Sequence, residues 1–265
     1  WAWGNGQNGE LGQGLDLVPK SSPVQVGTEE DWISLEASEG TVIAVREGGD
    51  LYGWGNGTVG QLGDGNSGVS NTVSSPVQIG ASGEWSEATK GGNAVGALFT
   101  IALKKDGTLW GSGRNDNGQL GDGTTESRST PVQVGTDSDW VFVACGDTFA
   151  HGIKSDGTLW GWGKNDLSNG LYGKLGLGGD FDDRSSPTQV GTDTDWVYVA
   201  CGNINGYAVK SDGTIYGWGA NTKGQLGVGS QIYKSSPTQM ITTLSAIQVR
   251  VCSNGSASGV MIIGA

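Results

Sequence analysis

Five copies of one repeat make up the sequence, and this repetition constrains the fold more than any other feature. Each copy opens with a string rich in Gly, Trp and Leu, followed by a Pro and a short β-prone run. The five strings read WAWGNGQNGELGQG, LYGWGNGTVGQLGDG, LWGSGRNDNGQLGDG, LWGWGKNDLSNGLYGKLGLGG and IYGWGANTKGQLGVG. They recur roughly every 50 residues, which is longer than the two-helix units of helical solenoids.

The local pattern of each copy predicts short antiparallel strands. No stretch shows a sustained 3.6-residue period, and Asp-Gly pairs between alternating runs are strong hairpin signals. We therefore expect four strands per unit, named A to D in chain order. In one copy, strand A covers 196–202, strand B covers 207–211, strand C covers 214–219, and strand D starts near Pro237.

Strand C carries the packing pattern of the repeat. In the segment 159–163, alternation places Trp160 and Trp162 on one face, and a Leu and two Gly residues on the other. A bulky face and a nearly bare face suit a ring of twisted sheets, in which the bulk of one sheet fills the hollow of the next. Ser112 replaces the second aromatic residue in one copy, so we expect a thinner contact there.

These patterns predict an all-β, single-domain β-propeller of four-stranded antiparallel blades. The chain begins inside a strand C and ends inside a strand B, so we expect five blades in a closed ring, with N-terminal strands C and D pairing with C-terminal strands A and B. The alternative is a part of a larger six- or seven-bladed ring. The expected blades cover residues 32–80, 85–135, 140–191, 196–241, and 247–265 together with 1–27.

Composition excludes several classes of function. The 265 residues include 50 Gly and 11 Trp, and the formal net charge is −12, which disfavours binding to nucleic acid. No apolar stretch reaches the ~18 residues of a membrane span, so we expect no membrane insertion. The first residue is Trp rather than Met, which suggests a processed product or a portion of a longer polypeptide.

The residue types that usually carry catalysis or metals are sparse. Cys145, Cys201 and Cys252 fall at one equivalent position in three copies, where we expect a small buried residue on the inner strand. The single His, His151, has no evident catalytic partner, so we expect a surface or packing role. We therefore predict no enzyme activity and no cofactor.

A short acidic run is the only candidate for a metal. Asp180, Asp182 and Asp183 follow two Gly residues and supply oxygen ligands of the kind that calcium prefers. Their spacing does not match a regular calcium loop, so a solvated acidic loop is favoured. The Gly-X-Gly strings precede no predicted helix and are not phosphate cradles.

Differences in length between the copies point to a binding surface. The A–B and C–D connections emerge on one face of an antiparallel blade, and three of them are enlarged, on three consecutive blades. Loops on a rigid scaffold often carry function, although neutral variation in length is an equal alternative. Candidate contact residues in these connections are Asn169, Leu171, Tyr172, Asn93, Phe99, Asn66 and Asn71. Tyr172 and Asn169 rank first, and the alternative for Phe99 is a buried position at the start of strand B.

The repeat WGxNxxGQLGxG…P…V…G…DGTLW resembles the regulator of chromosome condensation repeat family over the whole chain. The resemblance implies a β-propeller whose blades are split across repeat boundaries. Members include a guanine-nucleotide exchange factor for a nuclear GTPase, ultraviolet photoreceptors, an inhibitor of β-lactamase, and many bacterial and phage proteins. They share a scaffold rather than an activity.

The composition of the repeats, with few charged residues and many Gly and Thr, is most similar to that of the bacterial and phage group. We therefore expect a non-enzymatic recognition module of an extracellular, cell-surface or virion protein, which binds a protein or glycan through loops on one face. One alternative is a purely structural part of a fibre or virion assembly. Another is an exchange-factor-like intracellular regulator.

Overall fold

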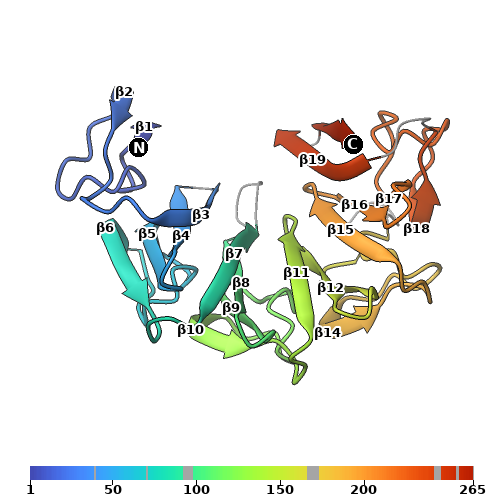
Figure 1. Cartoon of the computed structure of the whole chain (residues 1–265), viewed down its shortest axis with the longest axis horizontal. Helices are drawn as coiled ribbons and strands as arrows, with labels where there is room; N and C mark the ends of the chain where they lie inside the picture. Colours follow the sequence, from blue (N-terminus) through green and yellow to red (C-terminus); the bar gives the residue numbers. More distant parts are fainter. Residues whose placement is uncertain are drawn as a thin grey trace.

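The computed structural model describes residues 1–38, 40–69, 71–91, 98–165, 173–241, 246–254 and 257–264. The regular elements of this part of the chain are β-strands. None of its segments forms a helix long and apolar enough to cross a bilayer. The sheets follow one another along an open arc, with the two chain ends at the two ends of the arc (Figure 1).

Four sheets are complete blades of four antiparallel strands in the order A-B-C-D. The first blade consists of β3 (Trp32–Ser38), β4 (Thr41–Arg46), β5 (Leu51–Asn56) and β6 (Thr72–Ile79). The second consists of β7 (Trp85–Gly91), β8 (Phe99–Lys104), β9 (Leu109–Gly113) and β10 (Arg128–Gln133). The third consists of β11 (Trp140–Cys145), β12 (Phe149–Lys154), β13 (Leu159–Gly163) and β14 (Arg184–Gln189). The fourth consists of β15 (Trp196–Cys201), β16 (Asn205–Lys210), β17 (Ile215–Gly219) and β18 (Lys234–Gln239). The predicted all-β fold with four-stranded antiparallel blades is confirmed.

The ends of the arc are two half-blades. At one end, β1 (Ala2–Gly4) pairs with β2 (Lys20–Val24) as strands C and D. At the other end, β19 (Ala246–Asn254) pairs with β20 (Ala257–Gly264) as strands A and B. Among the described residues these are two separate sheets, and they lie far apart in Figure 1.

The predicted closure of one chain into a five-bladed ring is therefore wrong for this structure. The prediction rested on the complementary identity of the strands at the two ends, and that identity is correct. Closure also depends on the angle between neighbouring blades, which is set by how the side chains pack between them. At the observed angles, four complete blades and two half-blades turn through only part of a circle (Figure 1).

In the first, third and fourth blades, the second aromatic residue of strand C joins the blade to the preceding one. The indole Nε1 of Trp162 donates to the carbonyl oxygen of Gln119 at 3.0 Å, and that of Trp218 donates to Lys174 at 2.9 Å. Both indoles are fully buried. The predicted burial of these aromatics between blades is confirmed.

The interface between the first and second blades uses a different set of side chains. Here Ser112 stands where the other blades have Trp, and the Thr100 hydroxyl donates to the carbonyl oxygen of Gln61 at 2.8 Å. The Ser112 hydroxyl lies 3.5 Å from the same oxygen. The carbonyl oxygen of Gln61 thus accepts its hydrogen bond from a hydroxyl group instead of from an indole.

Glycines in the C–D connections allow close contact with the following blade. Gly118 has φ +75°, and a Cβ placed on it would lie 2.5 Å from the Cα of Ser185 in β14. Nearby, the amide of Gly123 donates to the carbonyl oxygen of Ser185 at 2.8 Å. Only Gly fits at such a position, because a side chain would meet the backbone of the next blade.

Strand register corrects one predicted equivalence. Cys201 pairs with Gly206, and the residue in the same position of β19 is Val251, which pairs with Val260. Cys252 is therefore one residue out of step with Cys145 and Cys201. The expected start of the last strand A at residue 247 is one residue late. Ala246 takes the place that Trp140 and Trp196 hold at the start of strand A, because its amide donates to Gly213 as theirs donate to Gly107 and Gly157.

Candidate binding surfaces

The only His packs against a Cys in the interior. His151 in β12 is fully buried, its Nε2 lies 3.2 Å from the carbonyl oxygen of Leu175, and its Nδ1 lies 3.5 Å from Sγ of Cys201. A carbonyl oxygen only accepts, so Nε2 carries the proton and Nδ1 faces the thiol as an acceptor. This proximity was not predictable from sequence spacing, because the two residues lie on neighbouring blades.

Burial keeps both members of this pair neutral. It lowers the pKa of His151 to about 4, and the hydrogen bond to Leu175 only partly opposes that shift. Burial likewise raises the pKa of the Cys201 and Cys145 thiols. Without a thiolate there is no strong nucleophile, and the predicted packing role of Cys145, Cys201 and His151 is confirmed.

Two of the three carboxylates proposed for calcium, those of Asp180 and Asp183, are used within their own loop. The side chain of Asp180 accepts from the amide of Asp182 at 3.0 Å and forms an ion pair with Arg184. The side chain of Asp183 accepts from the amide of Asn165 at 2.8 Å. No cluster of three metal-binding side chains occurs in the described part of the chain. These residues hold the C–D connection of the third blade in shape.

The predicted contact residues do not form one surface among the described residues. Asn93, Asn169, Leu171 and Tyr172 lie outside the described residues. Phe99 begins β8 and is fully buried in the core beside Ile101 and Trp140, so its assignment to a surface loop is wrong. The structure bears out the alternative for Phe99, a buried position at the start of strand B.

The two remaining Asn residues lie in the C–D connection of the first blade. Asn71 anchors the connection, because its Nδ2 donates to the carbonyl oxygen of Gly57 at 3.1 Å and its carbonyl oxygen accepts from the amide of Gly57 at 2.9 Å. Asn66 is exposed, and its Nδ2 donates to Asp64 at 3.0 Å. Part of the extra length between the Leu-Gly pair and the Pro of this copy lies in strand β6, which has 8 residues where β10 has 6.

Exposed aliphatic side chains recur in the C–D connections, and the sequence analysis missed them. Leu15 is 99% exposed between β1 and β2, Val69 is 96% exposed between β5 and β6, and Ile232 is 67% exposed between β17 and β18. Each lies between the Leu-Gly pair and the Pro of its copy. An apolar residue embedded in an otherwise polar, Gly-rich loop was the available signal.

The opposite face, which carries the Asp-Gly-Thr turns, is occupied by repeated structural clusters. Lys154 Nζ lies 5.1 Å from the ring centroid of Trp140 and 4.6 Å from that of Trp160. It also forms ion pairs with Asp137 at 2.8 Å and Asp139 at 3.2 Å. Lys210 has the equivalent partners in the fourth blade. These charges are already paired within the fold.

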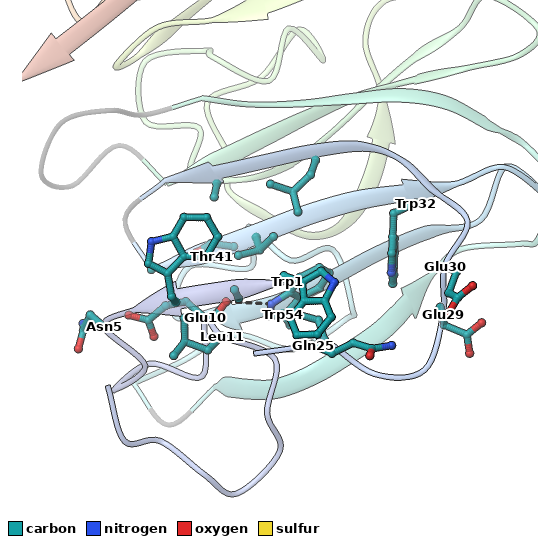
Figure 2. Close-up of a pocket in the computed structure, with 17 residues that line it drawn as sticks. Trp1, Asn5, Glu10, Leu11, Gln25, Glu29, Glu30, Trp32, Thr41 and Trp54 are labelled. Atoms are coloured by element: carbon teal, nitrogen blue, oxygen red, sulfur yellow. Dashed lines mark hydrogen bonds between the residues drawn. The ribbon is translucent and has the colours of Figure 1, made fainter. Parts of the chain in front are cut away.

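A groove of about 780 Å³ lies beside the N-terminal half-blade (Figure 2). Its lining includes Trp1, Ala2 and Trp3 around β1, the acidic residues Glu10, Glu29 and Glu30, and from the first blade Trp32, Leu35, Ala37, Val42 and Trp54. Figure 2 shows Glu29 and Glu30 together at one end, and the indole of Trp54 bonded to the backbone of Glu10. The groove is therefore apolar along its length and acidic at its margin.

Leu35 is exposed in the groove although its equivalents in other blades are buried, whereas Val42 and Trp54 of the same lining are buried. Leu35 is 59% exposed, whereas Val143 and Val199 at the same strand A position are 4% and 1% exposed. The difference arises because strands A and B of a preceding blade cover this position in the interior of the arc.

Comparison with known proteins places the repeat in a family. The model of the regulator of chromosome condensation (RCC1) repeat matches residues 48–102, 106–151, 156–206 and 212–258. The human regulator of chromosome condensation is 29% identical over 256 residues, which cover 90% of this chain and 59% of that protein. The ultraviolet-B receptor UVR8 of Arabidopsis thaliana is 33% identical over 249 residues, covering 92% of this chain and 54% of the receptor. The chain thus spans less than two thirds of the length of these relatives.

Solved structures agree with the fold. Human WBSCR16 superposes with a TM-score of 0.78 at 20% identity, over 100% of this chain and 68% of that one. Prp20p of Saccharomyces cerevisiae, whose structure is described together with its binding to Gsp1p and histones, superposes with a TM-score of 0.79 at 21% identity, over 99% and 61%. At such low identity the likeness supports the architecture alone.

Proposed function

Because the chain belongs to the regulator of chromosome condensation repeat family, we propose that it is a non-enzymatic interaction module that binds a protein partner through its C–D connections. The family scaffold presents short connections on rigid blades, and such connections are where interaction modules place their contact residues. The buried, neutral state of Cys201 and His151 supports a role without covalent chemistry.

The recurrence of exposed aliphatic side chains in the C–D connections carries the proposal. Leu15, Val69 and Ile232 belong to three different blades or half-blades, but they stand in the same connection of the repeat. Single exposed apolar residues are common on proteins. Their repetition at one place on one face is the arrangement that a protein partner requires for apolar contacts at several points.

A protein fits this surface better than a glycan. Sugar binding would need planar aromatic rings beside free amide groups. Of the predicted contact residues that the structure describes, Phe99 is buried in β8, Asn71 bonds to Gly57, and Asn66 bonds to Asp64. The partly exposed ring of Tyr233 stands beside the aliphatic Ile232. The exposed aliphatic groups instead match the apolar contacts of protein interfaces. The proposal places the module outside the cell or on a virion, as the style of its repeats suggested, and antibody labelling of intact cells or particles tests that location.

The experiment compares captured partners between matched variants. The triple variant Leu15→Asp, Val69→Asp, Ile232→Asp should fold, since the three side chains are exposed, but should lose the partner. Thr136→Asp, an exposed position on the opposite face, is the control and should retain it. Cross-linking with mass spectrometry in an extract of the source organism gives the readout. Equal capture by the triple variant and the control would show that these connections are not the binding surface.

A further inference from the structure

Exposed apolar side chains lie on the inner edge of the third and fourth blades. Strand A of each complete blade is on the inner side of the arc, and strand D is on the outer side (Figure 1). At the second position of strand A, Val141 in β11 and Val197 in β15 are 51% and 52% exposed. Two residues further along the same strands, Val143 and Val199 are buried. The exposure therefore belongs to this one position of the strand.

A β-bulge holds each of the two exposed valines out of the strand register. The pairing of β11 with β12 skips Val141, because the residues on either side of it pair with consecutive residues of β12. The pairing of β15 with β16 skips Val197 in the same way. Bulges re-aim side chains and are frequent beside functional sites.

The two valines belong to one surface, because the strands that carry them are in contact. The rings of Phe142 and Tyr198, which directly follow the valines, lie with their centroids 4.8 Å apart across the two blades. Both residues are partly exposed. In the second blade the corresponding positions hold the polar residues Ser86 and Glu87. We call the apolar surface of the third and fourth blades the rim patch, which consists of Val141, Phe142, Val197 and Tyr198.

Exposed carboxylates stand beside the rim patch, whereas the lysines that pair with them are buried. The side chains of Asp137 and Asp139, just before β11, are 44% and 45% exposed, but that of Lys154, which pairs with both, is only 10% exposed. Lys210 is covered in the same way in the fourth blade, and its two carboxylate partners are exposed. Each cluster therefore presents negative charge to the solvent although its lysine is paired.

The Asp-Gly-Thr turns add a further negative charge to each of these two clusters. Hydrogen bonds from Thr158 lower the pKa of the Asp156 carboxyl, and those from Thr214 lower the pKa of the Asp212 carboxyl. Both groups are thus ionised at neutral pH. In each blade, three carboxylates and one covered lysine lie at the end of the blade where strand A begins with its exposed valine.

We propose that the rim patch docks a segment of a partner protein in which basic side chains stand beside apolar ones. The apolar side chains of the segment cover Val141 and Val197, as in the core of a protein interface. Its Lys or Arg side chains lie against the exposed carboxylates that precede β11 and β15, which steer the encounter and fix its orientation. Charge complementarity selects this class of partner, because the same carboxylates repel an acidic segment or a phosphate backbone.

The docking site is separate from the surface proposed above. It lies on the face that carries the Asp-Gly-Thr turns, whereas the C–D connections emerge on the other face. A partner held at the rim patch therefore leaves the C–D connections open to a second protein, and failure of either proposal leaves the other intact.

The first test uses three fluorescently labelled peptides of equal length, which alternate Lys with Leu, Lys with Ser, or Glu with Leu. Fluorescence anisotropy with the unmodified chain should show the tightest binding for the Lys-Leu peptide, weaker binding for the Lys-Ser peptide and none for the Glu-Leu peptide. Binding of the Lys-Leu peptide should weaken as the salt concentration rises, because salt screens exposed charges. Equal binding of all three peptides, or none of the Lys-Leu peptide, overturns the proposal.

Matched variants assign the binding to the rim patch. The double variant Val141→Ser, Val197→Ser should lower the affinity for the Lys-Leu peptide by about tenfold and leave that for the Lys-Ser peptide nearly unchanged. The double variant Asp137→Asn, Asp193→Asn should weaken the binding of both basic peptides.

The control for the apolar variant lies on the other face. Leu15→Ser with Val69→Ser removes two exposed aliphatic side chains from the C–D connections and should bind the Lys-Leu peptide like the unmodified chain. A loss in this control as large as that in the rim-patch variant would contradict the assignment. Thermal unfolding of every variant checks that it is folded.

A labelling experiment on the unmodified chain decides the question if a variant fails to fold. A Lys-Leu peptide that carries a benzophenone group is irradiated in the complex, and the digested chain is analysed by mass spectrometry. Labels should fall in β11, in β15 and in the connections that precede them. Labels confined to the C–D connections would overturn the proposal.

Discussion

The indole Nε1 of Trp162 donates a 3.0 Å hydrogen bond to the carbonyl oxygen of Gln119. A side chain of the third blade thus provides the hydrogen-bond donor for a backbone carbonyl group in a loop of the second blade. The same relationship joins Trp54 to Glu10 and Trp218 to Lys174. Each indole buries apolar surface and donates a hydrogen bond to a carbonyl oxygen that would otherwise be buried without a partner. The blades are therefore coupled in sequence, each to the one before it.

Replacing Trp162 tests this coupling. Trp162→Ala should lower the free energy of unfolding by about 3–5 kcal/mol, as expected for a large-to-small change in a core. Trp162→Phe keeps most of the packing but leaves the Gln119 carbonyl without its donor, which should cost about 1–3 kcal/mol. Urea unfolding followed by circular dichroism measures both. Trp1→Ala, at a side chain that is 76% exposed, is the control, and an equal loss there would contradict the assignment.

Substitutions at two glycines distinguish the cost of backbone strain from the cost of forcing two blades apart. Gly118 and Gly135 both have positive φ, +75° and +59°. A Cβ on Gly118 would lie 2.5 Å from the Cα of Ser185, whereas one on Gly135 would meet nothing within 4 Å. Gly135→Ala should cost about 1–2 kcal/mol from backbone conformation alone. Gly118→Ala should cost clearly more, because the second and third blades must also move apart. Thermal unfolding of the two variants gives the comparison, and equal losses would argue against the close contact.

Stability should fall in mildly acidic solution because of His151. Its pKa is lowered by burial from 6.5 to about 4 in the folded chain. Between these values the unfolded chain binds a proton that the folded chain does not, so the free energy of unfolding decreases as the pH falls from 6.5 towards 4. The expected slope is about 1.4 kcal/mol per pH unit. Above pH 6.5 both states are neutral and the contribution is constant.

The matched variant for this prediction is His151→Ile. Ile43 and Ile101 occupy the same position in the first and second blades, so Ile should fit the third. The variant should unfold with a weaker dependence on pH in this window, as measured by thermal unfolding at several pH values. An unchanged slope would mean that other groups are responsible.

The extended C–D connection of the third blade can be shortened to test its role. Residues 166–172 lie outside the described residues, but the residues that flank them have clear equivalents. Asn165 bonds to the amide of Leu175 as Asn115 bonds to that of Leu120. Replacing 166–172 with the Asp-Asn of the second blade should preserve the fold, since shortening a surface loop costs little. It should weaken binding if Asn169 and Tyr172 contact the partner, and unchanged binding would assign this extra length to neutral variation.

Local features were predictable from the sequence because each copy encodes its own turns and alternation. The Asp-Gly-Thr turn at Asp156 forms as expected, with the Asp side chain accepting from the amide and hydroxyl of Thr158. The buried face of strand C, with Trp162, was also predictable. These features depend on residues close together in the chain, where spacing translates directly into geometry.

Features that depend on contacts between blades were not predictable. The proximity of Cys201 and His151 depends on the packing of two sheets, and the open arc depends on the angle at every such interface. The slip at Cys252 arose because a Trp landmark is absent from the last copy, where Ala246 takes its place. Two positions stayed open for Phe99, in a surface connection or at the start of strand B, because the length of a connection does not reveal where the following strand begins.

The hydroxyl pair at Gln61 has a mechanical consequence. At other interfaces a buried Trp of strand C contacts the preceding blade. The first and second blades are joined at this point by Thr100 and Ser112, whose hydroxyls share one carbonyl oxygen. A force applied along the arc is carried through every interface in series. Because this joint has no strand C indole, shear between β3 and β4 of the first blade and β7 of the second falls on two short hydroxyl groups and on the apolar contacts of Trp85.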